Sequence, residues 1–167
     1  MIHRDDPFAV GGRDPVRRFR GRLAAGVTIA TSGAGEGRTG LTVSSLMVLE
    51  GDPGWALLVV GPTSDLWTVV ADTGRLVVHV CGEGDRHLAE VFAGLRPSPG
   101  GLFASVEISE SDWGPVIDQL PDRAFCTLKG REELGYGGVL TATIDRIEVS
   151  DLTAPLVYYR GRFRSIR

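Results

Sequence analysis

The chain has 167 residues, of which 43% are hydrophobic and 23% charged, a composition ordinary for a single globular domain. Its 18 basic and 21 acidic residues give a net charge of -3, which excludes a global positive field able to attract nucleic acid or an anionic membrane surface. We therefore expect neither as a partner. Cys81 and Cys126 stand in apolar runs, and neither they nor the three histidines have the spacing of a zinc site, so the sequence predicts no metal centre.

The N-terminal region is rich in arginine. Residues 1–26 carry six arginines but no long apolar run of the kind found in signal peptides and membrane spans, so we expect a cytoplasmic protein. Residues 1–13 are expected to be a flexible segment, and residues 14–167 are expected to form the one domain.

The first predicted element is an amphipathic helix. Asp14 and Pro15 are typical of an N-cap and a first helical position, and Val16, Phe19 and Leu23 then recur at helical spacing until the glycine at position 26. A strand at 27–31 and a glycine-rich reversal at 33–40 follow, and they predict a hairpin with the next strand.

The remaining segments alternate between strands and short helices. The apolar run 55–60 predicts a central strand deep in the core, and Gly74 ends a short helix capped by Thr63 or Ser64. Further segments are predicted as strands at 76–81, 103–108, 124–128 and 139–149, a helix at 85–92 and a final strand pair in 155–163. The apolar positions of 139–149 change faces, which implies a bulge near Asp145 or Arg146. The sequence thus predicts an α+β protein that is mostly β, with a kink that helps its sheet close into a barrel.

Residues 38–48 place hydroxyl groups between apolar side chains. Because neighbouring side chains of a strand point to opposite faces, Thr42 and Ser44 share one side, and Ser45 then brings a third hydroxyl to the other. Buried hydroxyls need hydrogen-bond partners, so the row suits a ligand with many oxygens and ring nitrogens. The alternative is a strand whose Thr and Ser side chains simply face water.

The order of these segments resembles the flavin reductase-like family, the FMN-binding split barrels that serve as reductase components of two-component monooxygenases. The resemblance covers residues 15–166 and is carried by Gly-Leu-Thr-Val-Ser-Ser-Leu at 40–46, Ser-Asp-Leu-Trp-Thr at 64–68 and Pro-Leu-Val-Tyr-Tyr-Arg-Gly-Arg-Phe at 155–163. It implies a closed or partly open antiparallel Greek-key barrel with short flanking helices. It also implies a homodimer with flavin at the two-fold interface.

The resemblance further implies which residues bind FMN or FAD. The ring and ribityl chain would contact the 42–45 strand, and the phosphate would lie at the N-terminus of the helix that follows residue 61. Two interpretations stay open for Trp67, a wall of the flavin site or a core residue, and two for Tyr158 and Arg160, contact with the partner subunit's flavin or packing at the dimer interface. The predicted cofactor-binding residues are Thr42, Val43, Ser44, Ser45, Pro62, Thr63, Ser64, Trp67, Tyr158 and Arg160.

The function implied by the resemblance is hydride transfer from NADH or NADPH to flavin, with the reduced flavin diffusing to a partner monooxygenase. The chemistry belongs to the cofactor, so no catalytic side chain is predicted. One departure concerns the nicotinamide side: where the family often has Gly-Asp-His, this chain has Gly135, Tyr136 and Gly137. Tyr136 either stacks where a nicotinamide binds or is an exposed turn residue.

This departure motivates an alternative function, a flavin-binding carrier or presenting protein without nicotinamide turnover. A third interpretation keeps the barrel but replaces the ligand with haem or a deazaflavin, for which His79 and His87 would be the candidate haem ligands.

Overall fold

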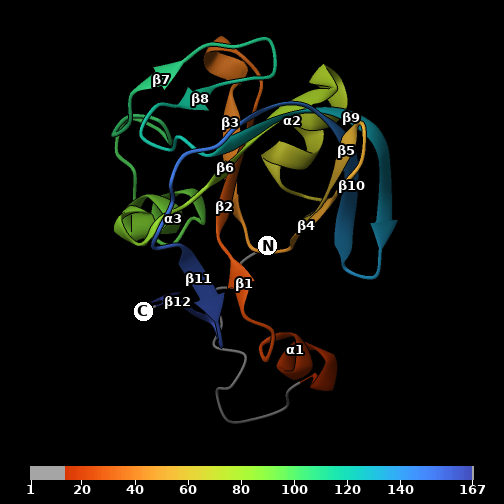
Figure 1. The fold of residues 1–167 in the computed structure, drawn as a ribbon, viewed down its shortest axis with the longest axis vertical. Coiled ribbons are helices and arrows are strands. Elements are labelled where there is room, and N and C mark those ends of the chain that lie inside the picture. Colours follow the sequence, from red (N-terminus) through yellow and green to blue (C-terminus); the bar gives the residue numbers. More distant parts are fainter. Residues whose placement is uncertain (1–13, 167) are drawn as a thin grey trace.

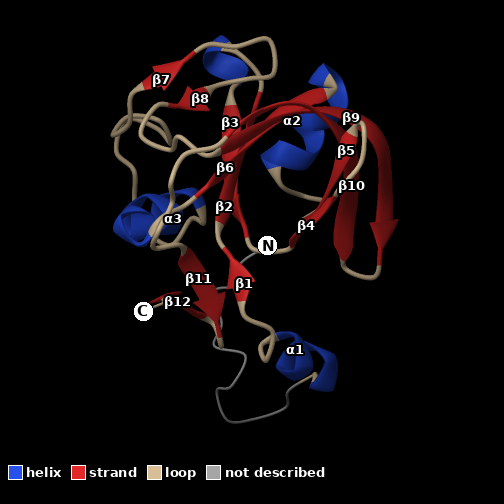
Figure 2. Ribbon diagram, in the orientation of Figure 1, coloured by secondary structure: helices blue, strands red, loops and turns tan. Residues whose placement is uncertain are grey.

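The computed structural model describes residues 14–166, so the segment 1–13, expected to be flexible, lies outside the described residues. Its main feature is a curled seven-stranded antiparallel sheet in the order β3-β2-β6-β9-β10-β5-β4 (Figure 1). The seven strands are β2 (Thr28–Ser32), β3 (Thr39–Val43), β4 (Leu46–Leu49), β5 (Gly54–Val60), β6 (Arg75–Val80), β9 (Arg123–Leu134) and β10 (Gly137–Glu148). Together with the few short helices, this confirms the predicted, mostly β split-barrel class (Figure 2).

Within residues 14–166, two small sheets and three α-helices complete the fold. A three-stranded sheet has the order β1-β11-β12, and β7 pairs with β8. These strands are β1 (Ala25–Gly26), β7 (Ile108–Ser109), β8 (Val116–Ile117), β11 (Leu156–Tyr159) and β12 (Arg162–Ser165). The helices are α1 (Pro15–Arg20), α2 (Asp65–Thr73) and α3 (Arg86–Phe92), with 3-10 turns η1 (Gly35–Gly37) and η2 (Glu83–Asp85).

The predicted bulge is present in β10. Ile144 pairs with Cys126 and Arg146 with Phe125, so Asp145 is the extra residue, and a second irregularity lies between Thr141 and Ala142. Such irregularities bend a strand and increase its twist, which curls the sheet toward a barrel. The concave side is filled by an apolar cluster that includes Leu58, Val70 and Leu140.

Three sequence predictions need correction. The 55–60 strand is second from the sheet edge rather than central, and its alternate side chains Trp55, Leu57 and Val59 are half-buried, because a strand near the edge is covered on one face only. Residues 103–108 form a strand only at Ile108, and β9 continues past residue 128 to Leu134 because it pairs with β10 in a long hairpin.

The N-terminal helix also differs from the expectation. It ends at Arg20, with Gly21 as its C-cap, and turns continue through hydrogen bonds from the Arg22 and Leu23 amides to the carbonyls of Phe19 and Arg20. None of its side chains is buried, so the predicted apolar face points to solvent. No helix within residues 14–166 is long and apolar enough to cross a membrane.

Candidate functional site

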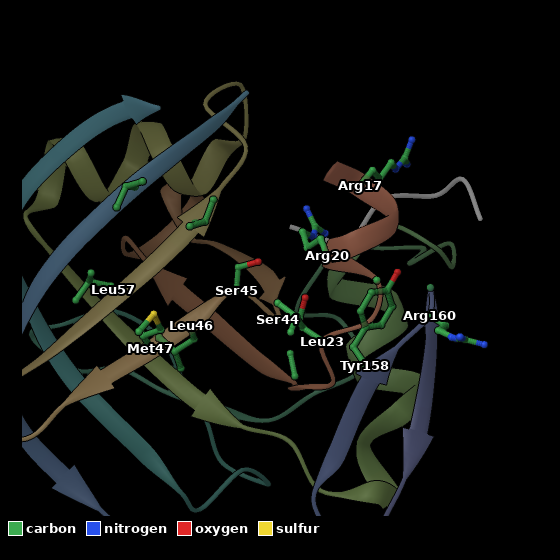
Figure 3. A pocket seen from close by; sticks show the side chains of 15 residues that line it. Arg17, Arg20, Leu23, Ser44, Ser45, Leu46, Met47, Leu57, Tyr158 and Arg160 are labelled. Carbon is green, nitrogen blue, oxygen red and sulfur yellow. The ribbon is translucent and has the colours of Figure 1, made fainter. Parts of the chain in front are cut away.

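A cavity of about 290 Å³ lies between the end of β3, strands β4 and β5, and the unit formed by α1 and the β11–β12 turn. Figure 3 shows Ser45, Leu46, Met47 and Leu57 on one side, and Arg17, Arg20, Tyr158 and Arg160 on the other. The lining residues are Arg17, Arg20, Gly21, Leu23, Ala25, Ser44, Ser45, Leu46, Met47, Leu57, Val59, Val139, Tyr158, Arg160 and Gly161. The cavity thus has an apolar part, two hydroxyls beside it and a basic rim.

Two hydrogen bonds to backbone carbonyls fix the turn that carries the two serines. β3 ends at Val43, whose carbonyl accepts from the Thr28 hydroxyl at 2.7 Å. The Ser45 carbonyl accepts from the Val59 amide at 2.9 Å, where β4 begins to pair with β5. Ser44 and Ser45 therefore sit on a turn held at both ends, as positioning of a ligand requires.

Only two of the four residues predicted on this strand line the cavity. Ser44 and Ser45 do, whereas Val43 is fully buried in the apolar cluster. Thr42 is also fully buried, and its hydroxyl donates to the carbonyl of Ala89 at 2.6 Å. The Thr42 hydroxyl therefore has a protein partner and does not line this cavity.

The predicted phosphate segment lies elsewhere in the fold. Pro62, Thr63 and Ser64 precede α2, and none of them lines the cavity. Ser64 is the N-cap of α2: its hydroxyl oxygen accepts from the Trp67 amide at 3.3 Å and donates to the Gly61 carbonyl at 2.7 Å. These contacts fix the start of the helix.

Trp67 packs in the core. Its side chain is 8% exposed and belongs to the apolar cluster of the barrel interior. The guanidinium carbon of Arg131 lies 4.4 Å from the ring centroid, and the Arg131 side chain donates to the Trp67 carbonyl at 3.2 Å. Of the two interpretations of Trp67, the structure places the residue in the core.

Tyr158 and Arg160 join the cavity from the C-terminal strands. The Tyr158 ring contacts Phe163 edge-on with centroids 5.4 Å apart, and the Arg160 amide donates to the Gly21 carbonyl at 3.3 Å. This second contact ties the β11–β12 turn to the end of α1, so the two parts of the basic rim are held together. Tyr136 is 94% exposed at the tip of the β9–β10 hairpin and does not line the cavity.

The sequence reasoning missed the basic and apolar residues of the cavity. Arg17 and Arg20 lie on α1, and the only signal for them was the run of arginines in that segment. Leu57 and Val59 stand at alternate positions of β5, a pattern hidden in a continuous apolar run. The Nε atom of Arg17 is shielded from solvent without a hydrogen-bond partner among the described residues.

The chemistry of the lining fits an aromatic ligand that carries phosphate. Three arginines line the cavity, and no carboxylate, histidine or thiol of residues 14–166 joins them, so the rim favours an anion. The apolar part can take a flat ring, and its volume is near the lower end of about 300–1,000 Å³ for ligand pockets. A flavin nucleotide, with its ring, polyol and phosphate, meets these requirements.

Of the two candidate haem ligands, His79 is engaged within the protein. His79 is fully buried, its Nδ1 lies 3.0 Å from the Ile29 carbonyl oxygen, and its Nε2 accepts from the Ile117 amide at 3.0 Å. Both ring nitrogens are therefore used inside the protein. Within the described part of the chain, no group of three His, Cys, Asp or Glu side chains could hold a metal ion.

The family model and the related proteins that match this chain all point to the same family. The model of a family described as flavin reductase like domain matches residues 20–167. The reductase component of 4-hydroxyphenylacetate 3-monooxygenase from Pseudomonas aeruginosa is 27% identical over 90% of this chain and 90% of its own length. The NADH-dependent FMN reductase AsuE2 of Streptomyces nodosus subsp. asukaensis is 28% identical over 99% of this chain and 91% of its own.

Solved structures agree. Component B of nitrilotriacetate monooxygenase from Mycobacterium thermoresistibile has a TM-score of 0.81 and 28% identity, covering 91% of this chain and 85% of its own. The NADH:FAD oxidoreductase SgcE6 of Streptomyces globisporus, in complex with NAD and FAD fragments, has a TM-score of 0.82 and 21% identity, covering 95% and 98%. At this identity, the similarity to SgcE6 shows a shared fold and no more.

Proposed function

The chain belongs to the flavin reductase like domain family, and from this premise we propose that it transfers hydride from NADH or NADPH to FMN or FAD and supplies the reduced flavin to a partner monooxygenase. Support comes from relatives named as NADH-dependent FMN reductases and as the reductase component of a monooxygenase. The domain proposed to carry this activity spans residues 14–167.

One observation carries the proposal: the cavity joins two serines on a fixed turn to an apolar part and a rim of three arginines. When bound, a flavin supplies a ring that accepts hydride and later passes the electrons on. Leu57, Val59 and Val139 would contact the ring from the β5 and β10 side. Ser44 and Ser45 would donate hydrogen bonds to its polar edge or to the ribityl chain.

The arginine rim would hold the phosphate. Arg17, Arg20 and Arg160 offer guanidinium groups, which suit phosphate oxygens through paired hydrogen bonds. Because no carboxylate, histidine or thiol of the described residues lines the cavity, its residues orient and shield the ligand rather than exchange protons with it. The phosphate role proposed for Pro62, Thr63 and Ser64 and the ring contacts proposed for Thr42, Val43 and Trp67 would require parts of the ligand to lie outside this cavity.

We also propose a homodimer. Apolar side chains are exposed both on α1, at Val16 and Phe19, and on the edge strand β4, at Met47 and Val48. Large exposed apolar areas on adjoining elements mark interaction surfaces in soluble proteins. In such an assembly Tyr158 and Arg160 would lie close to the subunit interface.

A second candidate function is flavin binding without nicotinamide turnover, as in a carrier or presenting protein. The observation that favours it is the hairpin tip, where Gly135, Tyr136 and Gly137 stand in place of the Gly-Asp-His that the family often has, and where Tyr136 is 94% exposed. If the protein is a reductase, Tyr136 would lie on the nicotinamide side of the bound flavin. The residue would come from the β9–β10 hairpin of one of the two subunits.

Absorbance spectroscopy separates these functions. The purified chain is mixed with FMN or FAD under anaerobic conditions, and flavin absorbance is followed after addition of NADH or NADPH. A reductase bleaches the flavin far faster than the same mixture without protein. Tight binding without faster bleaching selects the carrier, and failure to bind either flavin overturns both.

A further inference from the structure

The end of the molecule formed by α1 has an apolar surface with no partner among residues 14–166. Val16 is 73% exposed and Phe19 is 69% exposed, three residues apart on the same face of a helix. Figure 1 shows α1 at the lower end of the molecule, beyond β1 and the β11–β12 pair. An exposed aromatic and an exposed aliphatic residue side by side on one helix face are typical of an interaction surface.

Charge is strongly segregated between this end and the rest of the domain. Residues 14–26 and 155–166 contain seven arginines and one acidic residue, Asp14. Residues 27–154 contain 18 acidic and 8 basic residues, a net charge of -10. One copy of the chain therefore offers a basic apolar end and an acidic body, which attract each other between copies.

The acidic body contains an apolar groove. Two adjoining hollows, of about 660 and 240 Å³, share Val48, Ile144 and Ile147 in their lining. We call the two hollows together the groove. Its other apolar lining residues are Leu46, Leu49, Ala56, Val78, Val80, Ala124, Val149 and Leu152, and its acidic ones are Glu50, Asp52, Asp122, Asp145 and Glu148, against Arg123 and Arg146. The groove thus complements α1 in both polarity and charge.

α1 and the groove lie on either side of the same strand. Leu46 and Met47 of β4 line the cavity that Arg17 and Arg20 of α1 also line, while Leu46 and Val48 line the groove. β4 is an edge strand of the seven-stranded sheet. Because α1 and the groove both adjoin β4, one two-fold dimer can bury both surfaces of each copy. Surfaces at opposite ends of the molecule would instead join copies into an open chain.

We propose that α1 of each copy seats Val16 and Phe19 in the groove of a second copy, so that two identical α1–groove contacts form the dimer. The inference rests on the homodimer of the proposed function and names the surfaces that make it. It also links assembly to the site, because α1 carries Arg17 and Arg20 of the cavity rim. Docking α1 onto the partner subunit fixes that part of the rim.

Two variants test the pairing by analytical ultracentrifugation. The helix variant carries Val16→Asp and Phe19→Asp, and the groove variant carries Val48→Asp and Ile147→Asp. Each breaks both contacts of its own homodimer and is expected to raise the dimer Kd by about 100-fold or more, the effect of losing two central anchors. A 1:1 mixture restores one intact contact, that between the helix of the groove variant and the groove of the helix variant, so heterodimer forms more readily than either homodimer.

The control carries Leu95→Asp and Leu134→Asp, two exposed leucines outside both surfaces, and it stays dimeric. Circular dichroism and thermal unfolding establish that each variant is folded. Higher salt is expected to weaken the wild-type dimer because opposite charges face each other across it.

Three outcomes overturn the inference. They are a monomeric wild type, a helix variant or groove variant that remains as dimeric as the control, and a mixture of the two variants that dimerises no better than each alone. Flavin reduction is measured on the same samples. A wild type that reduces flavin but is monomeric contradicts this inference and leaves the proposed flavin reduction intact. A wild type that is dimeric but binds no flavin contradicts the proposed flavin reduction and leaves this inference intact.

Discussion

The amide of Ile117 donates to Nε2 of His79 at 3.0 Å, and this bond fixes the protonation of a fully buried ring. Because Nε2 accepts, the ring hydrogen is on Nδ1, which donates to the Ile29 carbonyl oxygen at 3.0 Å. One neutral imidazole thus connects β2, β6 and β8. A second proton on the ring would remove the acceptor for Ile117.

Acid should therefore destabilise the protein through His79. Burial lowers the pKa of His79 from about 6.5 to about 4. The unfolded chain takes up this proton below about pH 6.5 and the folded chain only near pH 4, so the stabilisation is complete above 6.5 and is lost as the pH falls to 4. The expected loss over this window is about 3 kcal/mol, measured by urea unfolding at a series of pH values.

Two variants isolate the contribution of this histidine. His79→Gln is expected to be less stable at neutral pH but to lose less stability between pH 6.5 and 4 than the wild type does. His87 is exposed, and His87→Gln should keep the wild-type pH dependence. Equal slopes for wild type and His79→Gln would contradict the assignment.

The hydroxyls of Thr42 and Ser44 should respond differently to removal. Thr42→Val removes one of the two donors to the buried carbonyl of Ala89, which keeps the amide of Ala93, and is expected to cost about 1 kcal/mol of unfolding free energy with little change in flavin Kd. Ser44→Ala and Ser45→Ala remove hydroxyls that line the cavity, and each should weaken flavin binding by about threefold to tenfold. Flavin titration and urea unfolding on the same samples check both parts. A Thr42→Val protein that lost flavin affinity but not stability would reverse the assignment.

Thr42 and Ser44 also show how much of the site could be predicted from the sequence. The alternation of residues 38–48 predicts the strand and the importance of its hydroxyls, but a strand hydroxyl can serve a ligand or a distant carbonyl. The hydrogen-bond partner of the Thr42 hydroxyl is the carbonyl of Ala89, 47 positions away, and no local sequence pattern predicts that contact. Ser44 and Ser45 follow the strand end and reach the cavity, as their predicted role requires.

The start of α1 could be predicted from Asp14 and Pro15, but the exposure of its apolar positions could not. Periodicity shows that Val16 and Phe19 share a face, and the usual inference is that such a face is buried. In this chain the face is exposed, and Arg17 and Arg20 line the cavity instead. The bulge at Asp145, by contrast, was predictable because a change of apolar face within one strand needs an extra residue.

Removing charge from the cavity rim should weaken flavin binding. Arg20→Gln deletes a cation that lines the cavity and is expected to raise the Kd for FMN or FAD by about tenfold, the effect of losing one charge-assisted hydrogen bond to phosphate. Arg18→Gln is the matched control, since Arg18 lies on the same helix but outside the cavity lining. Equal losses in both variants would indicate a general charge effect rather than a phosphate contact.

The close packing of Trp67 against β10 should make Gly138 intolerant of any side chain. A Cβ at Gly138 would lie 2.6 Å from the Trp67 ring, which is held between this glycine and the Arg131 guanidinium. Gly138→Ala is therefore expected to lower the unfolding free energy by about 1–3 kcal/mol, the usual cost of overpacking a core. Gly84→Ala is the matched control, because a Cβ there meets nothing within 4 Å and the residue has no positive φ. If Gly138→Ala unfolded at the same urea concentration as Gly84→Ala, the placement of Trp67 in the core would be wrong, and the ring would be available to a ligand.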